Sequence, residues 1–214
     1  GMMVSMIGPM LVLVFLFSGC MAVAPESIAG EKERGTFATM LVTPVKRSHI
    51  AIGKIIALST LSLISGICSF LGIILSLPKL VGGTGNISAT VYTASDYIML
   101  LGIVLSSVLV IVALISLISA FAKSVKEATN MIGPLMILVV LLGVSTMFTS
   151  GSAGAFFWYL IPLYNSARAM SGIFSFAASP LNVIITIASN LVVALLLAFA
   201  LAKMFDNEKI MFNK

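Results

Sequence analysis

The chain has 214 residues, of which 60% are hydrophobic and only 9% are charged, with a mean hydropathy of +1.19 and a formal net charge of +5. So few charges cannot cover the surface of a water-soluble domain of this length, which excludes the soluble classes and places the chain in a lipid bilayer. The excess of positive charge is explained by the enrichment of Lys and Arg in the cytoplasmic loops of membrane proteins, so we do not infer a nucleic-acid partner from it.

Long charge-free stretches predict an all-α integral membrane protein. Each stretch holds roughly the 20 apolar residues that a helix needs to cross about 30 Å of hydrocarbon. We expect one transmembrane domain with five spans, at about residues 2–23, 50–77, 97–121, 130–148 and 180–203. The segment 150–178 is expected outside, as a re-entrant or interfacial helix. Its aromatic residues Trp158, Tyr159 and Tyr164 favour the interface, because such side chains gather at the level of the headgroups.

The first span is predicted to end before Pro25, since the residue that precedes a proline disfavours the α conformation. A charged cytoplasmic loop of residues 25–49 follows. Within it we expect a separate short helix from about Ser27 to Leu41, capped by Ser27 and stopped by Pro44. Lys54, at the start of the second span, is expected to reach back to the headgroups.

The second span carries a stripe of small residues on one helical face. We interpret it as a site of close helix packing, and a polar track along a substrate path is the alternative. Leucine at Ser65 or Gly72 is then expected to weaken assembly. Pro78 is expected to begin an external loop. The stripe comprises Ser62, Ser65, Ser69, Gly72 and Ser76.

The distribution of Lys and Arg predicts the topology, because cytoplasmic flanks collect these residues. If the loop 25–49 is inside, ten of the 12 Lys and Arg residues are cytoplasmic and only Lys79 and Arg168 are external. The beginning of the chain is therefore expected outside and its end inside.

No catalytic or metal-binding pattern is found in the sequence. The single histidine, His49, has no carboxylate in helical register, and the residues before Lys54 do not form a phosphate-binding loop. Cys20 and Cys68 lie in apolar runs and predict no disulfide. A lipoprotein cleavage site at Cys20 is the alternative, although no positive residue precedes the run. The spans also lack the ionisable residues of proton-coupled carriers, so energy for transport is expected to enter through the charged loop.

The segment from Glu31 to Pro44, followed by Gly53 and Lys54, resembles the E-(K/R)-E-x-G-T-x-x-x-L-x-x-(S/T)-P…G-K loop of type-2 ABC exporter permeases. The segments 123–130, 161–165 and 205–212 extend the resemblance, which is greatest with the sodium-efflux branch. It implies a prokaryotic plasma-membrane export channel of two permease subunits, identical or different, each bound to a cytosolic ATPase. This chain is then no enzyme and holds no cofactor, whereas ATP and Mg belong to the ATPase. Family members have one more N-terminal helix, so the chain is expected to be the C-terminal membrane part of a permease.

The resemblance also implies which residues meet the ATPase. The helix of residues 26–43 would dock in the ATPase and convert nucleotide-driven closure into movement of the spans. Reversal of Glu33 to Lys is expected to uncouple ATP hydrolysis from export without disturbing the spans. The coupling residues would be Glu26, Glu31, Glu33, Arg34, Gly35, Thr36, Phe37, Met40, Leu41 and Pro44, with a second cytoplasmic contact at Lys123, Lys126 and Glu127.

Two other functions are compatible with the sequence. A non-transport membrane scaffold or anchor would need no ATPase, and a stand-alone channel or secondary carrier is disfavoured by the charge-free spans. The cargo stays open between sodium, a drug, a peptide and a lipid. The spans offer hydroxyl, amide and carbonyl oxygens, whereas sites for hard cations usually include a carboxylate.

Overall fold

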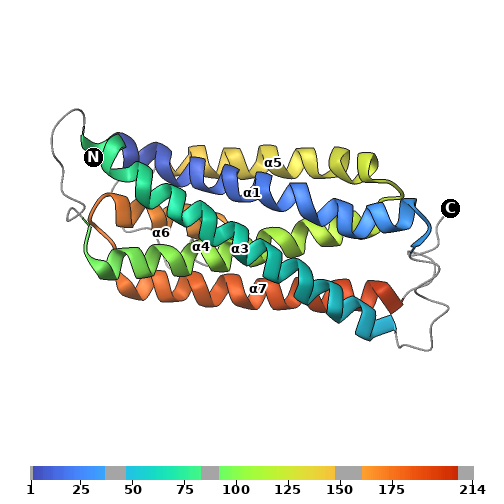
Figure 1. Cartoon of the computed structure of the whole chain (residues 1–214). Helices are drawn as coiled ribbons and strands as arrows, with labels where there is room; N and C mark the ends of the chain where they lie inside the picture. The colour runs from blue at the N-terminus through green and yellow to red at the C-terminus, as the bar shows by residue number, and fades with distance from the viewer. Residues whose placement is uncertain (1, 37–46, 83–91, 148–160, 207–214) are drawn as a thin grey trace.

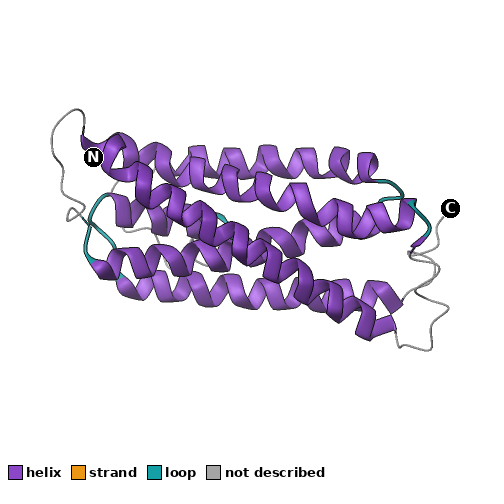
Figure 2. Cartoon of the chain, in the orientation of Figure 1, coloured by secondary structure: helices purple, strands orange, loops and turns teal. Residues whose placement is uncertain are grey.

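The computed structural model describes residues 2–36, 47–82, 92–147 and 161–206, and all regular structure in these ranges is helical (Figure 2). Five of the six helices are long and apolar enough to cross a membrane, as the composition predicted. The helices are α1 (Met2–Glu33), α3 (Arg47–Gly82), α4 (Ala94–Phe121), α5 (Val125–Met147), α6 (Tyr164–Phe174) and α7 (Pro180–Asp206).

Helix α4 lies at the centre of the bundle and contacts each of the other five helices (Figure 1). Of its most apolar window, 61% is buried within the chain, against 17% to 33% for the other four spans. The outer faces of those spans are apolar but exposed: Phe15 is 66% exposed and Leu195 is 70% exposed. Such faces suit contact with lipid, which does not penalise exposed hydrocarbon.

Helix α1 does not end at Pro25, contrary to the sequence-based expectation, but continues to Glu33. Pro25 and its neighbours Ala24, Ile28 and Ala29 are buried, and this packing compensates for the one backbone hydrogen bond that the proline removes. Gly35 lies just past the end of α1, and its φ of 72° is the left-handed conformation typical of a glycine at that position. In the described part, the expected separate helix is therefore the last turns of α1.

Two other helix boundaries also differ from expectation. Helix α3 continues through Pro78 to Gly82, so Pro78 does not begin a loop. Helix α5 begins at Val125 instead of near Asn130 and carries Pro134 on an exposed face. In hydrocarbon a backbone that leaves the helix has no water to bond, so helices continue through residues that would end them in water.

Helix α6 enters the bundle instead of lying on its outside. Near its start, Ser166 Oγ lies 2.8 Å from the Oγ of Ser107, which is midway along α4. Near its end, the Phe174 carbonyl accepts a hydrogen bond of 3.3 Å from Tyr92, just before α4 begins. Helix α6 therefore runs from the middle of the bundle to the end where α4 begins, as a re-entrant helix does. The interfacial interpretation was wrong for Tyr164, which is buried; Trp158 and Tyr159 lie outside the described residues.

Small side chains permit this close fit. Ala167 is fully buried in α6, and the helix contacts α1, α4, α5 and α7. The Ser171 hydroxyl donates a hydrogen bond of 2.9 Å to the Ser5 carbonyl of α1. Tyr92 stacks on Phe176 with ring centroids 4.9 Å apart, and burial raises the pKa of the Tyr92 hydroxyl, which stays protonated and able to donate to Phe174. These contacts join the end of α6 to the starts of α1 and α4.

Candidate functional site

One end of the bundle collects most of the described charges. We call it the charged end and define it as residues 26–36, 47–54 and 122–127, from the end of α1, the start of α3 and the turn between α4 and α5. The turn between α4 and α5 is far from the other two segments in the sequence, but both it and the start of α3 lie beside the end of α1 in the fold (Figure 1). The fold thus brings both predicted ATPase contacts to the same end.

Glu31 and Lys54 join α1 to α3 at this end. The Lys54 ammonium lies 2.5 Å from Glu31 Oε1 and also donates a hydrogen bond of 2.7 Å to the Ser27 carbonyl. The Lys54 side chain is only 11% exposed and the Glu31 side chain 25% exposed. Lys54 therefore binds α1 instead of reaching back to the headgroups, and Glu31 is largely occupied within the chain. Helix contact between α1 and α3 explains both departures from expectation.

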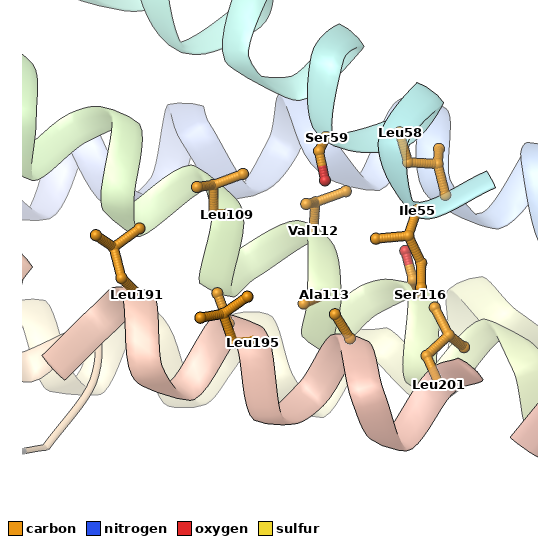
Figure 3. Close-up of a pocket in the computed structure, with 12 residues that line it drawn as sticks. Ile55, Leu58, Ser59, Leu109, Val112, Ala113, Ser116, Leu191, Leu195 and Leu201 are labelled. Carbon is orange, nitrogen blue, oxygen red and sulfur yellow. The ribbon is translucent and has the colours of Figure 1, made fainter. Parts of the chain in front are cut away.

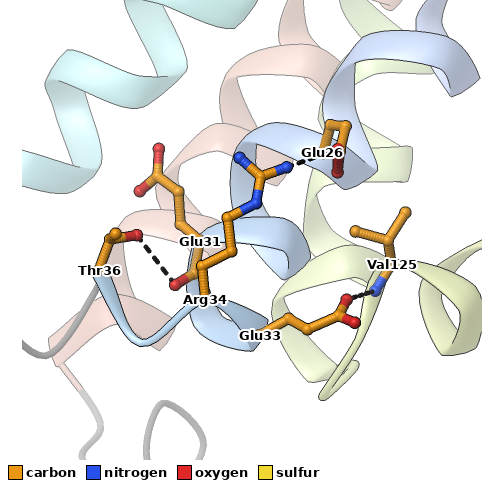
Figure 4. A network of polar contacts seen from close by, with 6 residues as sticks. All are labelled: Glu26, Glu31, Glu33, Arg34, Thr36 and Val125. Carbon is orange, nitrogen blue, oxygen red and sulfur yellow. Dashed lines mark hydrogen bonds and ion pairs between the residues drawn. The ribbon is translucent and has the colours of Figure 1, made fainter.

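Lys32 and Glu33 bind the ends of two other helices. The Lys32 ammonium donates to the carbonyl of Ala120 in the last turn of α4. Glu33 Oε2 accepts a hydrogen bond of 2.8 Å from the backbone N–H of Val125, the first residue of α5 (Figure 4). The last carbonyls and first N–H groups of a helix have no partner within it, so these contacts satisfy groups left open by both helices. Glu33 thus takes part in a contact between two helices, which the expected effect of its reversal did not include.

Glu26, Arg34 and Thr36 lie on the exposed side of α1's end (Figure 4). Arg34 and Glu26 form an ion pair of 2.6 Å, and their side chains are 62% and 50% exposed. Thr36 Oγ1 donates to the Glu31 carbonyl at 3.1 Å. An exposed ion pair adds little to stability, so these side chains are available to a partner. Of the other expected coupling residues, Gly35 ends the helix, whereas Phe37, Met40, Leu41 and Pro44 lie outside the described residues.

The turn between α4 and α5 presents the second predicted contact. Lys123, Lys126 and Glu127 are all exposed. Glu127 Oε2 accepts from the Lys123 N–H at 2.7 Å, while Ser124 Oγ accepts from the Glu127 N–H at 3.2 Å. Ser124 thus caps α5 and Glu127 stabilises the turn. The two lysines project from this ordered turn.

The small-residue stripe of α3 has two different environments. Ser62 is buried, and a Cβ on Gly19 of α1 would lie only 2.7 Å from Ser65 Oγ, so α1 and α3 lie close together here. Gly19 and Ser65 are at one part of an open groove of about 520 Å³ between the same helices, and Ser69 and Gly72 line it further along α3. A Cβ at Gly72 would meet no heavy atom within 4 Å. The side chain of Ser76 lies outside the described part.

A smaller cavity of about 150 Å³ lies between α3, α4 and α7 (Figure 3). Its walls are aliphatic, including Leu58, Leu109 and Leu195, with hydroxyls from Ser59 and Ser116. Sites for drug-sized ligands usually occupy about 300–1,000 Å³, so the cavity is too small for such cargo. It offers no charged group to a ligand.

The sequence reasoning missed a buried polar network at the middle of the bundle. Asn190 of α7 donates hydrogen bonds to Ser106 Oγ at 3.2 Å and Ser166 Oγ at 2.8 Å, and Ser107 joins it through Ser166. All four side chains are buried. The available signal was an asparagine in an apolar span, since such a residue needs a polar partner from another helix.

A bundle of five apolar helices long enough to span a membrane, with a shorter helix inside it and a charged end, defines the described part of the chain as a multi-pass membrane protein. The model of the ABC-2 family transporter proteins matches residues 3–209, and the chain belongs to this family. The membrane subunits of ABC-2 transporters are not enzymes, as expected for this chain.

The chain is also similar to the ABC transporter permease protein NatB of Bacillus subtilis (strain 168). The two are 34% identical over 171 residues, which cover 76% of this chain and 42% of that protein. The chain thus spans less than half the length of this relative. No solved structure matches this chain. The resemblance to type-2 ABC permeases is confirmed by the family match.

Proposed function

We propose that the chain is the permease subunit of an ATP-driven exporter and that the charged end is its dock for a cytosolic ATPase. The observation that carries this proposal is the gathering of exposed charges from two separate segments, Arg34 beside Glu26 and Lys126 beside Lys123, at one end of the spans. Between these surface charges, contacts made by Lys32, Glu33 and Lys54 join the helices. A force applied to this end would therefore act on α1, α3, α4 and α5 together.

The distribution of basic residues supports a cytoplasmic location for the charged end. Lys32, Arg34, Lys54, Lys123 and Lys126 belong to it, whereas Arg168 lies in α6, in the outer half of the bundle. Cytoplasmic flanks are enriched in Lys and Arg. In this arrangement the start of α1 faces outside, and two copies of the chain, or this chain and a related permease, would form the pathway.

Co-purification with the ATPase tests the proposed dock. Reversals at the exposed positions, Arg34→Glu and Lys126→Glu, are expected to reduce the recovered ATPase by about tenfold, which corresponds to about 1.4 kcal/mol of binding free energy. The matched control is Lys79→Glu, a reversal in the last turns of α3 at the opposite end of the bundle. Equal recovery for all three variants would show that the ATPase does not bind at the charged end. Failure of any ATPase to bind the unchanged protein would instead favour a membrane scaffold.

A further inference from the structure

The end of α1 lies between two helix ends of opposite polarity. Ala120, whose carbonyl accepts from Lys32, is in the last turn of α4, and Val125, whose N–H donates to Glu33, is the first residue of α5. The partial charge is negative at the C-terminal end of a helix and positive at its N-terminal end. A cation therefore meets the end of α4, and its sequence neighbour, an anion, meets the start of α5.

We infer that Lys32 and Glu33 are positioning residues that clamp the turn between α4 and α5 onto α1. We call this pair of contacts the clamp. Both partners of the clamp are backbone groups, whose polarity no substitution in α4 or α5 can reverse. The clamp therefore requires a cation at position 32 and an anion at position 33, in that order. The sequence pattern assigned Glu33 to the coupling surface and gave Lys32 no role, because the partners of these two residues lie 92 and 88 residues away.

The end of α1 and the turn between α4 and α5 pack so closely that the clamp can control the distance between them. A Cβ on Gly30, which is buried in α1, would lie 3.2 Å from a methyl carbon of Val125. The ion pair between Glu31 and Lys54 adds α3 to the same junction. The consequence for transport, which rests on the proposed function, is that the clamp makes the two ATPase contacts move as one body. Glu33 then acts through the turn and not by contact with the ATPase.

Exchange of the two charges tests the clamp without changing the composition of the chain. Cysteines at Gly30 and Val125, with Cys20 and Cys68 replaced by alanine, are expected to form a disulfide on mild oxidation of the purified permease. The double variant Lys32→Glu, Glu33→Lys is expected to lose most of this cross-link. Conservative replacement by Lys32→Arg and Glu33→Asp should retain it, because each position keeps its charge.

Two controls separate the clamp from general damage to the fold. Removal of the exposed ion pair by Arg34→Gln alone should leave the 30–125 cross-link unchanged, since the Arg34 side chain does not bond the α4–α5 turn in the described contacts. Glu26 is kept, because its carboxylate would lie 2.7 Å from a Cβ on Gly30. Cysteines at Gly19 and Ser65, where a Cβ on Gly19 would lie 2.7 Å from Ser65 Oγ, should cross-link equally in the exchanged variant. An undiminished 30–125 cross-link after exchange would overturn the clamp. Loss of both cross-links would show global disruption and would also contradict a local clamp.

A second measurement addresses the transport consequence separately. With an ATPase that binds the unchanged permease, the exchanged variant should keep complex formation but lose most of the permease-stimulated ATP turnover, and the conservative variant should restore it. Normal turnover together with a lost cross-link would show that the clamp does not couple the two contacts. Because the cross-link needs no ATPase, failure of the proposed function leaves the test of the clamp intact.

Discussion

At the scale of single residues, polar side chains in the apolar interior are conspicuous because each needs a partner. Asn190 satisfies two hydroxyls, Ser106 and Ser166, from two other helices. Thr186, one helical turn earlier on α7, is equally buried, but among the described residues its hydroxyl has no hydrogen-bond partner, and neither has the amide oxygen of Asn190. The two residues therefore differ in what their loss should do.

Asn190→Leu should destabilise the protein by about 1–2 kcal/mol, because it removes two interhelical hydrogen bonds from the membrane interior. Thr186→Val, which removes an unbonded hydroxyl and nearly preserves shape, serves as the control and should change stability by less. Thermal unfolding in detergent measures both. A Thr186→Val variant that is as unstable as Asn190→Leu would contradict the assigned hydrogen bonds.

The two environments of the α3 stripe predict opposite outcomes for one substitution. Ser65→Leu should cost about 1–3 kcal/mol by overpacking, because Ser65 Oγ would lie 2.7 Å from a Cβ on Gly19 of α1. Gly72→Leu should be tolerated within the single chain, since a Cβ there meets no atom, which corrects the expectation that both changes are harmful. Melting in detergent again provides the comparison. Should the leucine at Gly72 prevent subunit pairing, the groove is covered by a second copy.

At the scale of elements, α6 is the least predictable segment. Its composition allowed an interfacial helix. Its contacts show instead that it runs into the bundle: Ser166 of α6 bonds Ser107, and the Phe174 carbonyl of α6 accepts from Tyr92. A helix at the interface would expose one face, whereas Ser166 is fully buried.

Cysteine accessibility separates the two arrangements. A cysteine at Ser166 should resist an impermeant thiol reagent, whereas one at Phe176, which is 59% exposed, should react from the outer side. Both variants need a background without Cys20 and Cys68. Rapid reaction at position 166 would place α6 at the surface.

At the scale of the whole molecule, the orientation of the charged end links the fold to transport. In sealed cells a cysteine at the exposed Ser95, near the start of α4, should react with an impermeant reagent, while one at Lys126 should not. Disruption of the cells should then expose position 126. The reverse pattern would place the charged end outside, where no cytosolic ATPase could reach it.

Sequence alone determined the membrane class and the five spans. The free energy gained when about 20 apolar residues move from water into hydrocarbon outweighs the local conformational preferences of single residues. The loop pattern from Glu31 to Pro44 likewise indicated the family that the family match confirmed. These features depend on composition and on neighbours in the sequence. They can therefore be read without knowing which helices meet.

The tertiary structure decided the path of α1 through Pro25, the entry of α6 into the bundle and the partners of the charges. Local rules predicted a break at Pro25, but burial and the lack of water favour a continued helix. Glu33 was predicted to dock, and only the structure shows that it also bonds Val125, 92 residues away at the start of α5. A charge selects its partner by proximity in space, and that proximity exists only once the spans have packed.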